Sequence, residues 1–240
     1  QGVSQKKPRS AHTLNRKNTM KRDALFNMIE QQIRPWDVHN EAVLTALREL
    51  PRAGFLPESH RAFAYMDTEV PLVIDGVDTG TRLLAPRMLA RIVQTMDIAR
   101  TDEVGLVGLG DGYLAALLAR FARTVTAYEL NENALKFAQK NLNAHHVRNV
   151  NFELKDGLKH STDKFDVLVL AGSVTTLSDA VKQKINVGGR LFAVVGAVDA
   201  AVMSAVLVER TSDTNWHSTV LFETVTPALT QATPATAFSF

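Results

Sequence analysis

The alternation of short apolar segments with amphipathic segments between residues 88 and 195 most constrains the fold of this 240-residue chain. Strands separated by helices of about ten residues are typical of a parallel sheet covered on both faces. The predicted strands are residues 104–107, 125–128, 150–154, 165–170 and 190–195, and the predicted helices are residues 88–96, 113–121, 131–142 and 177–185. We therefore predict a doubly wound, mostly parallel α/β sheet.

The two ends of the chain follow different patterns. Residues 22–34 and 40–50 have apolar residues at helical spacing, and each segment is stopped by a proline, which predicts a small N-terminal helical region. Residues 51–81 are irregular and contain two glycine turn signals, so we expect a loop-rich segment there. Residues 202–209 and 219–224 alternate in polarity without a helical segment between them. They predict antiparallel C-terminal strands.

Basic charge is concentrated at the start of the chain. The first 22 residues contain seven Lys and Arg residues and no acid, whereas the rest of the chain has 20 basic and 25 acidic residues, a net charge of −5. Residues 1–21 could contact nucleic acid or act as a transit peptide, and composition favours a third interpretation, a disordered leader or an expression remnant ahead of a natural start at Met20. The mildly acidic remainder predicts no nucleic-acid partner.

Composition excludes several classes of site. The chain has no cysteine, which excludes disulfides, zinc–thiolate sites and a thiol nucleophile. It also has no apolar run of about 18 residues, so we expect no membrane span. The start lacks the apolar core of a secretory signal, which makes the cytoplasm the expected location. The pair His145-His146 lacks carboxylate partners, and no metal is expected.

The glycine cluster Gly108-Leu109-Gly110-Asp111-Gly112 lies between a predicted strand and a predicted helix. Glycines at this place let main-chain N–H groups approach a ligand closely, at the positive end of the following helix. The spacing is G-x-G-x-G, and Tyr113 stands where the dinucleotide fingerprint has its third glycine. The cluster therefore predicts a cofactor loop, although a tight turn would give the same residues.

Two acidic positions lie at the ends of the next predicted strands. Glu129 comes 19 residues after Gly110, where a carboxylate can accept hydrogen bonds from ribose hydroxyls, and Asp156-Gly157 follows the third strand. Considered separately, Glu129 could be a solvated acid at a helix entry and Asp156-Gly157 an ordinary turn. Together with the loop they predict a nucleoside cofactor without a pyrophosphate, which fits S-adenosylmethionine better than NAD. An NAD-dependent oxidoreductase is the alternative that Tyr113 disfavours.

Segments outside the glycine cluster resemble a known family, the protein-L-isoaspartate O-methyltransferases, which are class I enzymes that use S-adenosylmethionine. The segments that carry the resemblance are Leu50-Pro51-Arg52, Phe55-Leu56-Pro57, Ala64-Tyr65 with Asp67, Pro71-Leu72, Ala85-Pro86 with Met88, Val187-Gly188-Gly189-Arg190-Leu191 and Phe222-Glu223-Thr224. The resemblance covers residues 22–240, and residues 26–38 are similar to a bacterial branch. It implies a Rossmann-like methyltransferase fold.

The resemblance also implies roles for parts of the chain. Residues 85–240 would form the domain that binds S-adenosylmethionine, and residues 22–84 would form the acceptor side. The glycine cluster would cradle the amino-acid part of the cofactor, and Glu129 would hold its ribose. Leu130 is a further cofactor-binding candidate. Asp156 and Gly157 would contact the adenine, and Thr230 would match a threonine near the family's C-terminus.

The implied activity is methyl transfer to a carboxylate of damaged, isoaspartyl-containing protein, which is a repair reaction. Two positions depart from the family pattern. Leu106 stands where the family has an acidic residue that organises the cofactor's ammonium group, and Leu84 stands where it has the serine that holds the substrate carboxylate.

The candidate substitutes for that serine are Thr79, Thr81, Arg82 and Arg87. A carboxylate is already ionised at pH 7, so the reaction needs positioning rather than a general base, and the sequence identifies no catalytic residue. The alternative reading of the two departures is a catalytically degenerate family member that acts as a cofactor-binding or interaction module.

Overall fold

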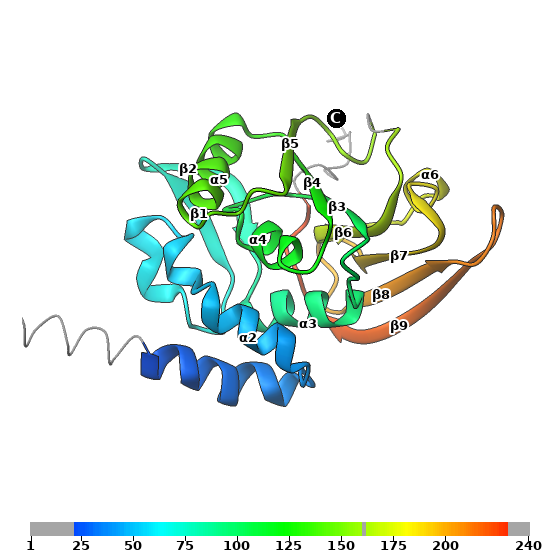
Figure 1. The fold of residues 1–240 in the computed structure, drawn as a ribbon. Helices are drawn as coiled ribbons and strands as arrows, with labels where there is room; N and C mark the ends of the chain where they lie inside the picture. The colour runs from blue at the N-terminus through cyan, green and yellow to red at the C-terminus, as the bar shows by residue number, and fades with distance from the viewer. Residues whose placement is uncertain (1–21, 160–161, 230–240) are drawn as a thin grey trace, which may run out of the picture.

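A seven-stranded sheet forms the centre of the computed structural model, which describes residues 22–159 and 162–229 (Figure 1). Its strand order is β5-β4-β3-β6-β7-β8-β9. The strands are β3 (Glu103–Val107), β4 (Thr124–Glu129), β5 (Val150–Leu154), β6 (Phe165–Val174), β7 (Ile185–Val195), β8 (Met203–Arg210) and β9 (Trp216–Thr224). The pairs among β5, β4, β3, β6 and β7 are parallel, whereas β7–β8 and β8–β9 are antiparallel. The predicted mostly parallel sheet with antiparallel C-terminal strands is confirmed.

Helices cover the two faces of this sheet unequally. Helices α3 (Pro86–Met96), α4 (Tyr113–Ala119) and α5 (Glu132–Ala144) bury their apolar faces in one core together with alternate strand residues such as Leu106. The opposite face, to which Val107 belongs, is covered by the short α6 (Asp179–Lys182) and by residues near the C-terminal end of the described chain. The first face is therefore the main core of the protein.

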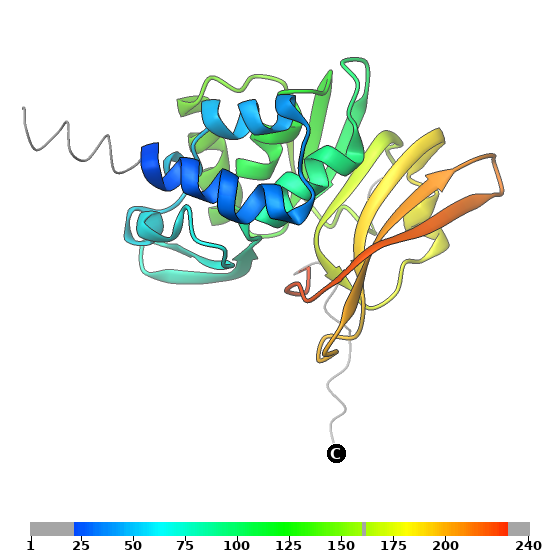
Figure 2. The same ribbon diagram turned by 90° about the horizontal axis from the view of Figure 1, so that it is seen from below.

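The N-terminal region adds a further layer of helices. Residues 22–28 are α-helical and continue as a π-helical turn, Ile29–Ile33. Helix α2 (Glu41–Glu49) follows, and the side chain of Asn40 caps it by accepting two main-chain N–H groups. The first helix and α2 lie on the same side of the molecule as α3 (Figure 2). The predicted N-terminal helical region is confirmed.

Residues 51–81 differ from the expected loop-rich segment, because they contain a β-hairpin. Two 3₁₀ turns, Arg52–Gly54 and Glu58–Phe63, lead into β1 (Val70–Ile74) and β2 (Val77–Leu83). Most of β2 is exposed, so its sequence lacks the alternating apolar pattern that would have predicted a strand. The turn signal at residues 75 and 76 was correct, since both have a positive φ and join the two strands.

The predicted helix at residues 177–185 is also wrong in length. Only Asp179–Lys182 is helical, and Ile185 already belongs to β7, where it pairs with Phe165. Leu177 and Ile185, the apolar residues at the two ends of the predicted helix, pack in the core on one face of the sheet.

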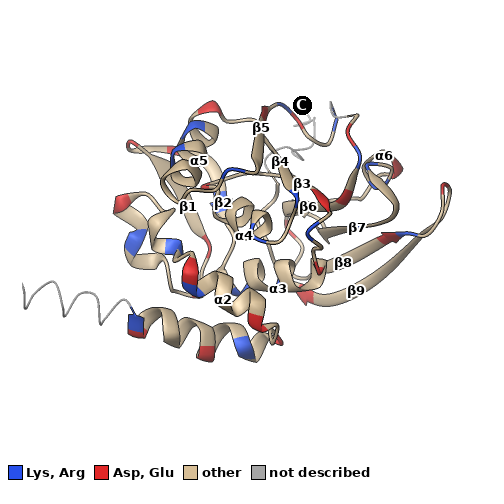
Figure 3. Cartoon of the chain, in the orientation of Figure 1, with Lys and Arg blue, Asp and Glu red and all other residues tan. Residues whose placement is uncertain are grey.

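Positive and negative side chains are interspersed over the described part of the chain (Figure 3). Among the described residues no helix has the length and apolar character needed to cross a membrane. The cytoplasmic location stays a prediction, and residues 1–21 lie outside the described residues.

Candidate active site

A pocket lies beyond the carboxyl ends of β3 and β4. Its walls are residues 81–84 at the end of β2, residues 108–111 after β3, Glu129 at the end of β4, and Ala228 with Leu229 near the C-terminal end of the described chain. The strand order reverses next to β3, since β4 lies on one side of it and β6 on the other. Open α/β sheets bind their ligands at such a switch point.

The glycine loop reaches this pocket with a backbone that favours glycine. Gly108, Gly110 and Gly112 have φ angles of 93°, 57° and 87°, in the left-handed region that other residues rarely adopt. Gly108 and Gly110 line the pocket, and a Cβ on Gly108 would come within 2.8 Å of Leu229. Gly112 instead packs against Ala138 of α5. The first two glycines therefore let the loop pack closely against Leu229 and Leu83 of the pocket lining.

Glu129 is tied to the glycine loop. Its Oε2 accepts a hydrogen bond from the Gly110 N–H at 3.2 Å, and its Oε1 accepts from the N–H groups of Leu130 (2.9 Å) and Asn131 (3.0 Å). The side chain is buried, so these three bonds fix the carboxylate at the pocket wall. Glu129 is thus not the solvated acid of the alternative interpretation.

A carboxylate offers about four acceptor positions, so about one remains on Glu129 for a ligand hydroxyl. Binding two hydroxyls would require it to give up a main-chain donor. The bond from Gly110 is the longest of the three and is the one most easily exchanged.

Asp156 and Gly157 follow β5 at the same edge of the sheet. Asp156 is buried and accepts from the main-chain N–H groups of Leu158 and Lys159, at 2.9 and 3.3 Å. A Cβ on Gly157 would come within 2.6 Å of the ring of Tyr128, which is the residue before Glu129 in β4. These two residues lie beside β4 but outside the lining of the pocket described above. Leu130 is exposed next to Glu129.

The four candidate substitutes for the missing serine separate into two groups. Thr81 and Arg82 line the pocket, and Arg82 also pairs with Asp78 at 3.1 Å. Thr79 lies outside the pocket lining and donates to the Leu72 carbonyl at 2.9 Å. Arg87 also lies outside it and is engaged with Asp67 and the Trp36 ring. Leu84 itself is buried and presents an apolar surface to the pocket.

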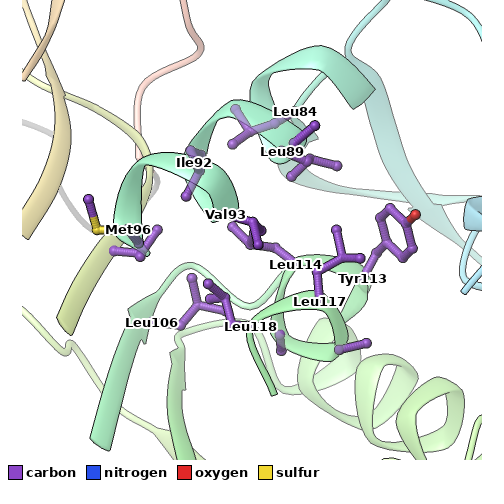
Figure 4. Close-up of a cluster of buried hydrophobic side chains, with 14 of the residues drawn as sticks. Leu84, Leu89, Ile92, Val93, Met96, Leu106, Tyr113, Leu114, Leu117 and Leu118 are labelled. Carbon is purple, nitrogen blue, oxygen red and sulfur yellow. The ribbon is translucent and has the colours of Figure 1, made fainter. Parts of the chain in front are cut away.

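Leu106 occupies a core position rather than a pocket position. It is fully buried and lies beside Leu118, near Val93 and Met96 of α3 (Figure 4). It is absent from the pocket lining. A leucine here therefore strengthens the packing between the sheet and its helices, and other residues must hold any charged group of a cofactor.

Arg52 is the functional candidate that the sequence analysis missed. It lines the pocket although its side chain is only 1% exposed, and its Nη2 donates to the Leu84 carbonyl at 2.9 Å. Burial lowers the pKa of its guanidinium, an effect that nearby Asp111 partly offsets. The available signal was a single arginine among apolar residues in the segment Leu50-Pro51-Arg52, which was interpreted only as a part of the family resemblance.

Asp111 is the buried acid of the glycine loop. Its Oδ1 accepts from the Tyr113 N–H at 3.0 Å, and burial raises the pKa of its carboxyl to about 6, against the opposing effect of Arg52. Tyr113, the next side chain in this cluster, packs against Phe55 with ring centroids 5.0 Å apart and the ring planes tilted by 56°. Burial raises the pKa of its phenol as well. The pocket thus has buried polar groups on one wall and leucines on another.

The family to which this chain belongs follows from a match to a protein-family model. The model of the family described as "Protein-L-isoaspartate(D-aspartate) O-methyltransferase (PCMT)" matches residues 22–231. The chain belongs to this family. The match includes the N-terminal helices, the β-hairpin and the entire seven-stranded sheet, so the resemblance predicted from the sequence is confirmed.

Individual relatives agree with the PCMT assignment. A protein-L-isoaspartate O-methyltransferase of Rhodopseudomonas palustris strain CGA009 is 31% identical over 172 residues, which are 71% of this chain and 77% of the relative. Protein-L-isoaspartate O-methyltransferase 1 of strain HaA2 is 32% identical over 187 residues, with coverage of 77% and 74%.

A solved structure shares the fold of this PCMT-family chain. It is a Plasmodium falciparum protein described as a putative protein-L-isoaspartate O-methyltransferase in complex with S-adenosyl-L-homocysteine. It is 16% identical, has a TM-score of 0.71, and the alignment covers 88% of this chain and 98% of that one. The Rossmann-like methyltransferase architecture expected from the sequence is therefore confirmed. Thr230 lies outside the described residues, and its role stays a prediction.

Proposed function

We propose that this chain is an S-adenosylmethionine-dependent O-methyltransferase that acts on isoaspartyl residues of damaged proteins. The observation that carries the proposal is the hydrogen bond from the glycine loop to Glu129, from Gly110 N–H to Oε2 at 3.2 Å. It joins the two elements that a nucleoside cofactor needs, a loop for close main-chain approach and a fixed ribose acceptor. Membership of the PCMT family supplies the reaction type.

The residues of the pocket fit S-adenosylmethionine. Gly108 and Gly110 expose the loop backbone at the pocket without a Cβ, which would clash with Leu229 or Leu83, and Glu129 retains an acceptor position for a ribose hydroxyl. The exposed Leu130 offers apolar surface to the adenosine, and Asp156 with Gly157 lies at the same sheet edge for the adenine. We assign these residues, together with Leu109, Asp111 and Gly112, to the cofactor half of the site.

Residues 22–84 supply the acceptor half. The end of β2 brings Thr81, Arg82, Leu83 and Leu84 to the pocket lining, and Arg52 donates a hydrogen bond to the Leu84 carbonyl. Of the four substitutes for the family serine, Thr81 and Arg82 are the two that reach the pocket. We assign them to contact the isoaspartyl carboxylate.

The chemistry requires positioning and the exclusion of water. When bound, the cofactor supplies a methyl group on a sulfonium, which an acceptor carboxylate oxygen takes while the methyl–sulfur electron pair stays on sulfur. The acceptor is ionised at pH 7, so no residue of the chain has to remove a proton. The buried wall formed by Leu83, Leu84, Leu89 and Leu114 keeps water from the reacting groups.

The test is transfer of labelled methyl from S-adenosylmethionine to a pair of synthetic peptides that differ only in an isoaspartyl or a normal aspartyl linkage. The isoaspartyl peptide should be labelled, and the peptide with the normal aspartyl linkage should not. Glu129→Gln should lower labelling at least tenfold, because it removes the charge of the ribose acceptor. Glu132→Ala, which removes an exposed carboxylate one turn away, should leave labelling unchanged.

Labelling of both peptides, or of neither, would reject the proposed substrate. The buried Leu84 favours a second candidate function, in which the protein binds the cofactor but does not transfer its methyl group to isoaspartyl residues. Tight binding of S-adenosylhomocysteine without labelling of either peptide would support this binding-module alternative.

A further inference from the structure

Arg52 and Asp111 are two buried, oppositely charged side chains that both line the pocket and both have unused polar atoms. Asp111 Oδ2 and the Arg52 atoms Nε and Nη1 have no hydrogen-bond partner among the described residues. Their side chains are in the interior, with exposures of 5% and 1%. Buried polar atoms without partners are rare in folded proteins, and each such atom calls for an explanation.

The pair does not satisfy itself. Each residue feels the charge of the other, but no ion pair joins them at an N–O distance of 4.0 Å or less within the described part of the chain. Each is instead held by one main-chain bond, Arg52 to the Leu84 carbonyl at 2.9 Å and Asp111 to the Tyr113 N–H at 3.0 Å. A positive and a negative side chain of the pocket lining thus keep hydrogen-bonding capacity that no described residue uses.

We propose that Arg52 and Asp111 together bind the α-aminocarboxylate group of the cofactor, Arg52 its carboxylate and Asp111 its ammonium. This inference rests on the proposed function. A zwitterion matches the arrangement because it carries an ammonium and a carboxylate on the same carbon, and it would supply the partners that Nε or Nη1 and Oδ2 lack. A single acceptor carboxylate would satisfy Arg52 but would leave Asp111 unpaired and repelled.

The arrangement accounts for the departure at Leu106. In the family pattern an acid at that position organises the cofactor's ammonium, whereas here the position is filled by a core leucine that does not reach the pocket. Asp111 lies five residues further along the chain, in the glycine loop that follows β3, and contributes a carboxyl group to the pocket lining. The ammonium site has therefore moved from the strand end into the glycine loop.

The test compares two ligands by calorimetry on the full chain, one with the aminocarboxylate and one that lacks this group and the two carbons that carry it. S-adenosylhomocysteine carries the aminocarboxylate, and 5′-methylthioadenosine keeps the adenosine and the thioether but lacks it. Asp111→Asn and Arg52→Gln should each weaken S-adenosylhomocysteine by ten- to a hundredfold and leave the affinity for 5′-methylthioadenosine within twofold. Arg52→Lys should lose less than Arg52→Gln, since it keeps the charge.

The matched control is Tyr113→Phe. Its hydroxyl is a buried atom without a partner in the same cluster, but Tyr113 does not line the pocket, so this variant should bind both ligands as the parent does. The inference is overturned if the Arg52 and Asp111 variants leave S-adenosylhomocysteine binding unchanged, or if they weaken both ligands equally. Failure of the parent protein to bind either ligand would instead reject the proposed cofactor, which separates the two failures.

Discussion

The guanidinium of Arg52 donates a hydrogen bond of 2.9 Å from Nη2 to the main-chain carbonyl oxygen of Leu84. This bond connects the 3₁₀ turn Arg52–Gly54 to the end of β2, across 32 positions of sequence. It ties the backbone at Leu84, the position where the resemblance implies a substrate-binding serine, to the N-terminal turns.

Restoring the family residue should improve the acceptor half of the site. Leu84→Ser should raise kcat/KM for an isoaspartyl peptide by about tenfold, because a hydrogen bond to a charged group contributes about 1.5–3 kcal/mol. It should also cost about 2–4 kcal/mol of unfolding free energy, since a buried leucine is lost. Steady-state kinetics and urea unfolding measure both effects.

Leu83→Ser is the matched control for this variant. It removes a neighbouring buried leucine of the same wall, so it should cost similar stability without the gain in kcat/KM. Equal kinetic changes in the two variants would show that position 84 has no special relation to the substrate carboxylate.

Restoring the family acid at Leu106 should fail. Because this side chain is fully buried among the residues of α3 and α4, Leu106→Glu should cost 3 kcal/mol or more of unfolding free energy and should not tighten S-adenosylhomocysteine. Leu106→Met keeps the volume and should cost less than about 1.5 kcal/mol. A stable glutamate variant with improved affinity would place position 106 in the pocket, against the structure.

Asp111 should make stability fall as pH rises. The pKa of its carboxyl is about 6 in the folded protein and near 3.8 in the unfolded chain, so the folded state binds an extra proton between these values. The contribution of Asp111 to the free energy of unfolding is thus greatest below pH 4, declines up to pH 6 and is then constant.

Asp111→Asn removes this titration. The variant should gain about 1–3 kcal/mol over the parent on going from pH 4 to pH 8, by urea unfolding of both proteins across the range. The two titratable groups that face the carboxyl are the guanidinium of Arg52 and the phenol of Tyr113, and neither changes its charge between pH 4 and pH 8. A stability difference that is independent of pH would contradict the buried, ionised Asp111.

The glycine loop can be tested against a glycine elsewhere with the same backbone conformation. Gly108 and Gly188 have φ angles of 93° and 82°, so Ala at either position should cost about 1 kcal/mol in backbone strain. Only at Gly108 does the new methyl group meet the pocket wall, within 2.8 Å of Leu229, while Gly188 faces open space. Gly108→Ala should weaken S-adenosylhomocysteine more than tenfold, and Gly188→Ala should not; equal affinities would argue against close approach at the loop.

Much of the fold could be predicted from local patterns. The predicted strands at residues 104–107, 125–128 and 150–154 fall within β3, β4 and β5, because short apolar segments between helices are typical of parallel strands. The order of the strands in the sheet does not follow from these patterns. The β1–β2 hairpin could not be predicted, because most of β2 is exposed and lacks the alternating apolar pattern of a half-buried strand. Helix α6 was overestimated because the apolar residues at its two ends belong to the sheet core.

The contact between the glycine loop and Glu129 was easier to predict than the proximity of Arg52 and Asp111. Gly110 and Glu129 follow consecutive strands, so their approach at 3.2 Å could be expected from the topology of a parallel sheet. Arg52 comes from a separate region, and it meets Asp111 only because the N-terminal turns pack against the glycine loop. Local sequence carries no periodic signal for such a contact.

The most direct test of this account is a calorimetric titration of the unmodified protein with S-adenosylhomocysteine, with NADH as the comparison ligand. The account predicts a single site of micromolar affinity for S-adenosylhomocysteine and no binding of NADH, because the loop and Glu129 fit a nucleoside without a pyrophosphate. No heat of binding at millimolar S-adenosylhomocysteine, or tighter binding of NADH, would contradict it.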